Sequence, residues 1–151
     1  MSASPEQLHE LLTYCINFAQ TMLEKAGDFY PFGATLSPAG KVGAVGGYTG
    51  EERPNPQEIY KLLSGGFLTG GRSGQYAAVA LAANVNIPFQ YSPPYPDGLR
   101  VHLESEGYAR FIYVPYKLGS KGIFLKARAV QFEKPISVQI NPSFFVGAGN
   151  G

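Results

Sequence analysis

The stretch LRVHLESEGYARFIYVP, residues 99–115, decides the fold of this chain. Apolar and polar residues alternate on both sides of Glu106 and Gly107, and a period of two is typical of strands with one buried face. A two-residue turn at Glu106 and Gly107 makes the two strands an antiparallel hairpin. On one largely apolar face, this hairpin pairs Leu103 with Arg110, Val101 with Ile112 and Leu99 with Val114.

The other face of the hairpin is charged and aromatic, and carries Arg100, His102, Glu104, Phe111 and Tyr113. Two neighbouring predicted strands offer Ala80, Ala82, Asn84 and Asn86, and Lys126 and Arg128. We predict that these side chains share one outer sheet face, which is aromatic and mildly basic and has small residues at its base. The candidate ligand- or partner-binding residues are Arg100, His102, Phe111, Tyr113, Lys126 and Arg128. The alternatives are an ordinary solvated face, a face covered by the second helix, or a register shifted by one residue.

Residues 4–25 have the pattern of an amphipathic helix, with apolar positions at Leu8, Leu11, Leu12, Cys15, Phe18, Ala19 and Met22. Ser4, Pro5 and Gln7 provide a capping oxygen, a preset φ and a reciprocal cap, and Gly27 provides the stop. The sequence therefore predicts that the chain begins with a capped helix.

Residues 32–36 and 41–48 flank the turn-forming cluster SPAG and are predicted to form a hairpin. Asn55 as cap, Pro56 and Glu58 indicate the start of a second helix. Its far end is SGGFLTGGRSG, where five glycines each disfavour helix by about 1 kcal/mol relative to alanine. We expect the second helix to fray there.

Residues 76–89, 99–105, 108–115 and 123–132 are predicted strands, so the order is αββα followed by three or more strands. Alternating βα units are absent, which favours an α+β fold over a doubly wound sheet. We predict an antiparallel sheet of about five to six strands with two helices packed on it. Residues 1–140 are expected to form one domain and residues 141–151 a glycine-rich tail, which is expected to be mobile after Phe145.

The segment FYPFG, residues 29–33, follows the first helix and precedes the hairpin. In this it resembles a family of small uncharacterised bacterial proteins, with weaker similarity through AAVAL and VPY, but the resemblance implies no activity. The element order also resembles profilin-like and roadblock-like domains at the level of the fold, which carries no function. A structural role for FYPFG is favoured over a ligand anchor, because Pro31 fixes the strand entry and Gly33 permits close approach.

Composition limits the classes of function. The chain has 151 residues, of which 44% are hydrophobic and 15% charged, as expected of one globular domain. A net charge of +1, with lysine and arginine occurring singly, disfavours nucleic-acid binding. Cys15 is the single cysteine, so no disulfide can form within the chain. Without a signal peptide or a run of about 18 to 20 apolar residues, we expect a cytoplasmic protein that does not bind membranes.

Two motif-like patterns are set aside. Residues 66–73, GFLTGGRS, match a phosphate loop except that Arg72 replaces the lysine, but a helix precedes and a strand follows, which is the reverse of the required order. Two histidines and one cysteine do not make a metal site, and no cofactor is expected. His9 is predicted to lie on the surface and Cys15 to be buried as a small hydrophobe.

No set of nucleophile, base and orienting group is recognisable, which favours a non-catalytic function. Our leading hypothesis is an intracellular module that binds another protein, of an immunity or adaptor-like kind. The alternative is a binder of small anionic ligands, or an enzyme, on the outer sheet face. There Arg100 or Arg128 would hold the anion, and His102, with Glu104 nearby, would exchange a proton.

Overall fold

The structure is a computed structural model that describes residues 3–47, 50, 52–119 and 128–146. The described part contains the helices α1 (Pro5–Ala26) and α2 (Pro56–Ser73) and the short 3-10 helix η1 (Phe89–Tyr91). Its strands are β1 (Phe32–Leu36), β2 (Val42–Gly46), β3 (Ala78–Asn86), β4 (Asp97–Ser105), β5 (Tyr108–Leu118), β6 (Val130–Phe132) and β7 (Ile136–Gln139). The predicted α+β class, with an antiparallel sheet and two helices packed on it, is confirmed.

In the described part of the chain, the sheet has seven strands: six follow the order β2-β1-β3-β4-β5-β6, and β7 pairs with the other half of β5. The predicted hairpin is confirmed down to its register, because Leu103 lies opposite Arg110 and Val101 lies opposite Ile112. β7 is too short, at four residues, to show a clear period in the sequence. None of the described helices is both long and apolar enough to span a membrane.

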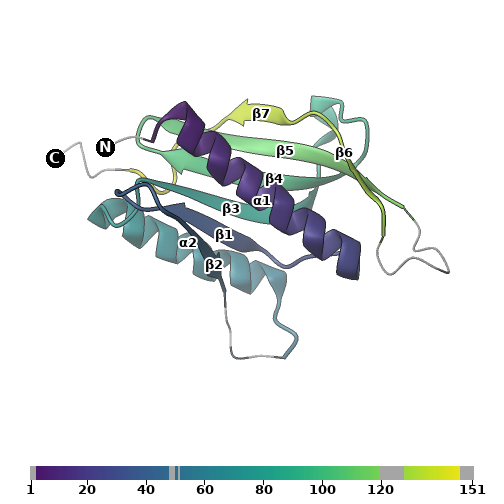
Figure 1. Ribbon diagram of the computed structural model, residues 1–151, viewed down its shortest axis with the longest axis horizontal. Coiled ribbons are helices and arrows are strands. Elements are labelled where there is room, and N and C mark those ends of the chain that lie inside the picture. Colours follow the sequence, from purple (N-terminus) through teal and green to yellow (C-terminus); the bar gives the residue numbers. More distant parts are fainter. Residues whose placement is uncertain (1–2, 48–49, 51, 120–127, 147–151) are drawn as a thin grey trace.

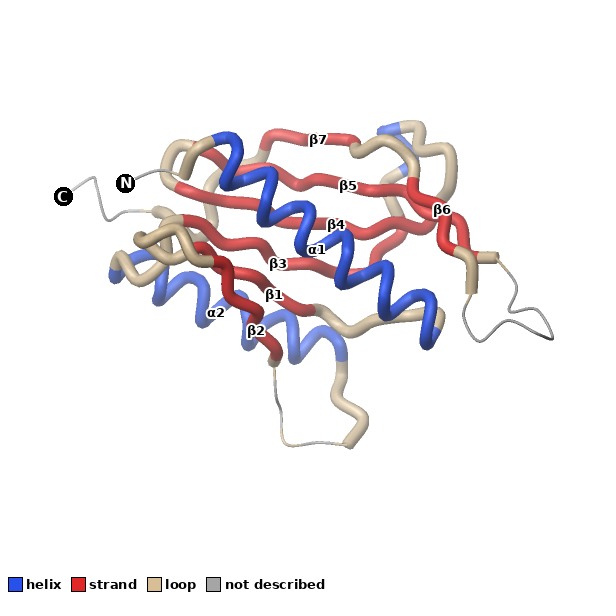
Figure 2. The backbone as a smooth tube through the Cα atoms, viewed as in Figure 1, coloured by secondary structure: helices blue, strands red, loops and turns tan. Residues whose placement is uncertain are grey.

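The two helices lie on opposite faces of the sheet (Figures 1 and 2). α1 crosses β3 and β4, and buries Leu11, Cys15 and Ala19 against the alanines of β3. α2 lies along the β1 side of the other face, where its Ile59, Leu63 and Phe67 contact Val79, Leu81 and Phe144. A separate apolar core layer therefore lies on each face of the sheet.

The capping signals of both helices are confirmed. The Ser4 hydroxyl accepts a hydrogen bond from the Gln7 N–H at 3.2 Å, and the Gln7 side chain accepts one from the Ser4 N–H at 2.9 Å. Asn55 accepts a hydrogen bond from the Gln57 N–H at 2.8 Å. Such caps satisfy backbone donors that have no partner within the helix.

The expectation that α2 frays in its glycine-rich stretch is wrong, because the helix continues to Ser73. A Cβ on Gly70 would overlap the ring of Tyr76, and one on Gly71 would overlap the carbonyl group of Phe144. These glycines allow close packing, and that packing offsets their low helix propensity. Because residues 66–73 are helical, their backbone N–H groups are engaged within the helix and cannot form a phosphate loop.

The small residues of β3 do not lie where the sequence suggested. Ala80 and Ala82 belong to the core beneath α1, on the face opposite His102 and Arg100. Their small side chains let the helix approach the sheet closely. On the Arg100 side, β3 presents the larger Val79 and Leu81 beside Glu104 and His102, and the small Ala83 directly opposite Arg100.

The FYPFG segment links α1 to the sheet. Phe29 and Phe32 are buried, and the Phe32 ring lies 4.4 Å from that of Phe18, measured between centroids. A Cβ on Gly33 would overlap the ring of Phe67 from α2, so Gly33 permits the close approach that the sequence suggested. These contacts support the structural interpretation of the segment.

The expected domain boundary at residue 140 does not coincide with the end of the packed chain. Phe144 is only 2% exposed, and its ring packs against Phe67 at 5.8 Å between centroids. The backbone N–H groups of residues 143–145 donate hydrogen bonds to Glu104. The first part of the predicted tail therefore belongs to the fold, whereas residues 147–151 lie outside the described part.

Cys15 lies in the core beneath α1, as predicted, and burial raises the pKa of its thiol to about 12. We expect the native protein to react with iodoacetamide at pH 8 only as fast as it unfolds, because the reactive form is the thiolate. Mass spectrometry of alkylation with and without denaturant measures this. Rapid labelling of the native protein would contradict the buried placement.

Candidate functional site

Four predicted site residues share one sheet face: Arg100 lies opposite Tyr113, and His102 opposite Phe111, across β4 and β5. The confirmed register excludes the slip that would have moved them to the α1 core. Arg100, Phe111 and Tyr113 are joined by Tyr60 of α2 and Tyr91 of η1. We call these five residues the Arg100 cluster.

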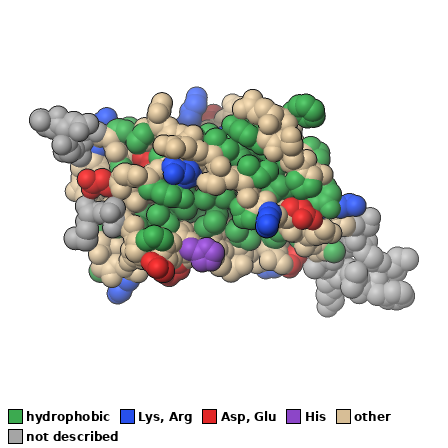
Figure 3. Space-filling view, turned by 90° about the horizontal axis from the view of Figure 1, so that it is seen from above, with side chains coloured by type: hydrophobic (Ala, Val, Ile, Leu, Met, Phe, Trp, Pro, Cys, Tyr) green, Lys and Arg blue, Asp and Glu red, His purple; other side chains and the backbone are tan. Residues whose placement is uncertain are grey.

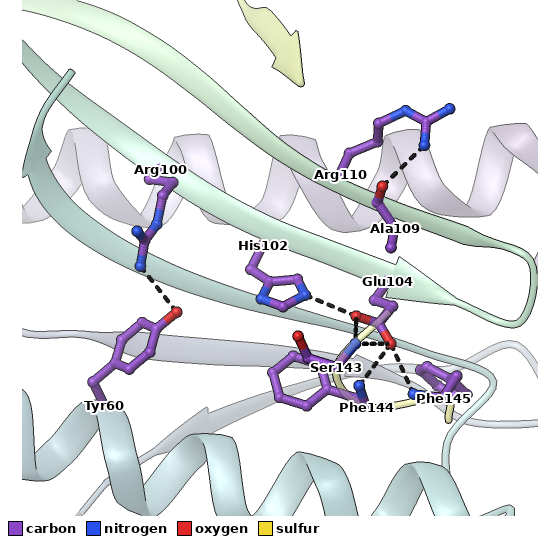
Figure 4. Close-up of polar contacts among 9 residues, drawn as sticks. All are labelled: Tyr60, Arg100, His102, Glu104, Ala109, Arg110, Ser143, Phe144 and Phe145. Carbon is purple, nitrogen blue, oxygen red and sulfur yellow. Dashed lines mark hydrogen bonds and ion pairs between the residues drawn. The ribbon is translucent and has the colours of Figure 1, made fainter. Parts of the chain in front are cut away.

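The guanidinium group of Arg100 lies among aromatic rings. Its Nη2 donates a hydrogen bond of 2.9 Å to the Tyr60 hydroxyl (Figure 4). Its Cζ lies 4.5 Å from the centroid of the Phe111 ring and 5.4 Å from that of Tyr60. A cation over aromatic faces gains electrostatic energy while it keeps apolar neighbours. The buried Nε has no hydrogen-bond partner in the described part of the chain.

The aromatic side of the cluster is well packed. The Tyr91 and Tyr113 rings are 5.6 Å apart, and those of Phe111 and Tyr113 are 6.2 Å apart, between centroids. Burial raises the pKa of the Tyr113 hydroxyl, and the positive charge of Arg100 opposes this shift. Tyr113 is therefore a neutral hydroxyl at pH 7, not an anionic partner for Arg100.

β7 extends this surface toward the edge of the sheet. Val138 lies opposite Phe111, and Ile136 opposite Tyr113, so their partly buried side chains continue the same face. Figure 3 looks down on this edge of the molecule, where hydrophobic side chains cover much of the middle of the view. On its own face, the cluster borders the apolar side chains of Ile136 and Val138.

His102 and Glu104 belong to the same face but are buried beneath the chain segment of residues 143–145. His102 is 4% exposed, and its ring stacks on that of Phe144 at 4.5 Å. Its Nε2 is hydrogen-bonded to Glu104 Oε1 at 2.8 Å (Figure 4). The predicted partner of His102 is thus correct, but the pair is covered, which leaves His102 without access to a ligand at Arg100.

Glu104 holds the segment through its carboxylate. Oε2 accepts hydrogen bonds from the N–H groups of Phe144 and Phe145, each at 2.7 Å, and Oε1 accepts one from Ser143 at 2.8 Å. Burial by itself would raise the pKa of this carboxyl group, but the hydrogen bonds from His102 and the backbone outweigh it and hold the pKa below its usual range. We call this arrangement the Glu104 clasp.

The two remaining predicted residues are not brought into the cluster. Arg128 lies at the C-terminal end of α1, where its N–H donates to the Glu24 carbonyl at 2.9 Å and its side chain lies against Gly27. Gly27 ends the helix that covers the opposite sheet face, so Arg128 lies on that side of the sheet and not beside Arg100. Lys126 falls outside the described residues.

Sequence reasoning missed Tyr60 and Tyr91. Tyr60 is next to the core residue Ile59 on α2, so the period of that helix places it near the sheet without showing which strand it meets. Tyr91 lies in a proline-rich connection that has no period. Within the described residues, no three His, Cys, Asp or Glu side chains are placed to hold a metal ion.

Comparison with known proteins gives no match for this chain among family models, curated proteins or solved structures.

Proposed function

We propose that the chain is a non-catalytic intracellular module that binds another protein through the Arg100 cluster and the adjoining face of β7. The observation that carries the proposal is a half-buried guanidinium group held against aromatic rings beside an apolar sheet face. α2 packs on β1 and β3 and borders the cluster through Tyr60. The unpaired Cys15 suits a reducing compartment, and an immunity or adaptor-like role fits this class of module.

The composition of the cluster favours a protein partner. Arginine and tyrosine are enriched among residues that contribute most to binding at protein interfaces, and aromatic side chains are enriched there generally. Arg100 is already oriented by Tyr60 and by the face of the Phe111 ring, so little side-chain entropy would be lost on binding. A rigid cation beside apolar surface is a suitable anchor.

The partner is expected to present a carboxylate to Arg100. Among the described residues, no carboxylate forms an ion pair with this guanidinium group, and the nearby Glu104 is engaged by His102 and the backbone. A carboxylate from the partner would form a charge-assisted hydrogen bond with the guanidinium group. Apolar groups beside that carboxylate would cover Ile136 and Val138 of β7.

The burial of His102 argues against the catalytic alternative. General acid–base catalysis needs a titrating group within hydrogen-bond reach of the substrate. The His102 ring is instead stacked under Phe144 and bonded to Glu104. Arg100 alone can still bind an anion, so a small anionic ligand is one outcome of the following test.

Replacing Arg100 by glutamine is expected to weaken partner binding at least tenfold, about 1.4 kcal/mol, because a desolvated charge at an interface is lost. The experiment compares capture from a lysate of the source cells by the natural chain, Arg100→Gln and Arg110→Gln. Arg110 is a matched control on the neighbouring strand, with its side chain on the opposite face beside Tyr108. Binding of the purified partner is then measured by calorimetry.

Thermal melting checks that each variant is folded. A partner that binds Arg100→Gln and Arg110→Gln equally, or a natural chain that recovers no partner under gentle conditions, would refute the proposal. Calorimetric titration with glutarate and with phosphate tests the small-anion alternative. Arg100-dependent binding of either anion without any protein partner would favour that alternative.

A further inference from the structure

A hollow lies around the C-terminal end of α1. Its volume is about 880 Å³, within the usual range of small-molecule sites. The segment after α1, the ends of β3 and β5, and the start of β4 all contribute to it. Its polar and aromatic lining includes Asp28, Tyr30, Asn84, Asp97 and Tyr116. We call it the Asp28 pocket.

A chain of hydrogen bonds orders one wall of this pocket. The Tyr116 hydroxyl donates to Asn84 Oδ1 at 2.7 Å, and Asn84 Nδ2 donates to Asp28 Oδ1 at 2.7 Å. Asp28 Oδ1 also accepts the Phe29 N–H at 2.7 Å. These bonds connect β5, β3 and the segment after α1, so the carboxylate of Asp28 is held in one orientation. Asp28 is exposed, and its Oδ2 has no hydrogen bond within the described part of the chain, so it is accessible to a ligand.

The pocket is negatively charged. Asp28 and Asp97 both line it, its described lining contains no lysine, arginine or histidine, and Arg128 lies at its margin against Gly27. The pKa of the Tyr116 hydroxyl is raised chiefly by burial, against the hydrogen bond to Asn84, and the charges of Asp97 and Asp28 raise it further. Tyr116 therefore stays a neutral donor at pH 7, and the formal charge of the pocket comes from its two carboxylates.

The remaining walls are apolar or aromatic. Tyr30 is 51% exposed at the pocket although it is a large ring, and Met22 and Pro54 also line it. A cation gains energy from an aromatic face in addition to a carboxylate, and an alkyl chain can lie against the apolar wall. The Tyr30 ring is thus accessible to a ligand, unlike the buried rings of Phe29 and Phe32.

The geometry points to a binding site for a small organic cation, an alkyl compound with an amine or guanidinium group, in the Asp28 pocket. The cationic group contacts Asp28 and Asp97, and the alkyl portion lies along Tyr30 and Met22. A bare metal ion fits the pocket less well, because the described residues bring no three metal-ligating side chains together. This site shares no lining residue with the Arg100 cluster.

Calorimetric titration with agmatine, which carries both an amine and a guanidinium group, tests the inference directly. We expect saturable binding by the natural chain, and a dissociation constant about tenfold larger for Asp97→Asn and for Asp28→Asn, because each change removes one carboxylate charge. Glu10→Gln is the matched control, since it removes an equal charge from an exposed position on α1 outside the pocket lining. Glutarate is the control ligand of opposite charge.

Asp28 also accepts structural hydrogen bonds, so Asp97→Asn remains informative if Asp28→Asn fails to fold. Absence of agmatine binding at millimolar concentration would overturn the inference. Equal binding by the natural chain and Asp97→Asn, or equal binding of glutarate, would overturn it too. Arg100→Gln should bind agmatine normally, so failure of this site and failure of the protein-binding proposal are separate results.

Discussion

Replacement of Glu104 by alanine is expected to lower the free energy of unfolding by about 3 to 5 kcal/mol at pH 7, because it removes the partner of several buried groups at once. The N–H groups of residues 143–145 and the His102 ring would all lose their acceptor. Urea denaturation followed by circular dichroism measures the change. Glu104→Gln keeps one acceptor oxygen, so its free energy of unfolding should lie between those of Glu104→Ala and the natural chain.

Glu10→Ala, on the exposed side of α1, is the matched control and should change stability by less than about 0.5 kcal/mol. Near-equal stability of Glu104→Ala and the natural chain would show that Glu104 does not hold the terminal segment. Hydrogen exchange provides a second measure, because the amides of residues 143–145 should lose protection in Glu104→Ala.

The Glu104 clasp also determines part of the response to acid. Because the pKa of Glu104 is lowered in the folded state, its contribution to stability is present above the unfolded carboxyl pKa of about 4.3. This contribution is lost as the pH falls through the folded pKa. Stability measured from pH 7 to pH 3 should therefore decline less steeply in Glu104→Gln than in the natural chain. An identical slope would contradict this assignment.

Gly71→Ala is expected to destabilise the protein by about 2 kcal/mol, although the same change normally stabilises a helix by about 1 kcal/mol. The added methyl group would overlap the backbone carbonyl of Phe144, which cannot move aside as a flexible side chain would. Gly65→Ala is the control in the same helix, because open space surrounds that position and the helix gain should appear there. Denaturant titration of both variants measures the changes in the free energy of unfolding, which should have opposite signs.

Stabilisation by Gly71→Ala would mean that the terminal segment does not rest on α2. A double variant provides a further test, because Gly71 and Glu104 hold the same segment from two sides. Once Glu104→Gln has loosened the segment, Gly71→Ala should lower the free energy of unfolding by less than it does in the natural chain. Strict additivity would indicate that the two contacts are independent.

The hairpin around Glu106 and Gly107 was predictable because its signals are local. Alternation identifies two strands, and a two-residue turn then leaves one register. The caps of α1 and α2 are equally local. The course of α2 beyond Ser64 was not predictable, because propensity alone disfavours glycine and the reason for Gly71 is a contact with Phe144, far along the chain.

The candidate site was predicted only in part, again because local signals can be recognised in the sequence and long-range contacts cannot. Strand parity shows which residues share a face, so Arg100, Phe111 and Tyr113 were grouped correctly. Parity does not show what covers a face. The burial of His102 under Phe144, and the placement of Ala80 under α1, depend on long-range packing that no single segment encodes. Arg128 was misplaced because residues 128 and 129 precede β6, which begins at Val130, whereas the predicted strand included them; residues 123–127 of that strand lie outside the described part.

The Glu104 clasp also has a consequence for biosynthesis. During translation, β4 leaves the ribosome well before residues 143–145, which lie about forty positions later in the chain. Until they emerge, Glu104 lacks three of its donors, and the α2 layer lacks the ring of Phe144. The α2 layer therefore stays incomplete until residues 143–145 have been made. Closing this long-range contact becomes a late step of folding.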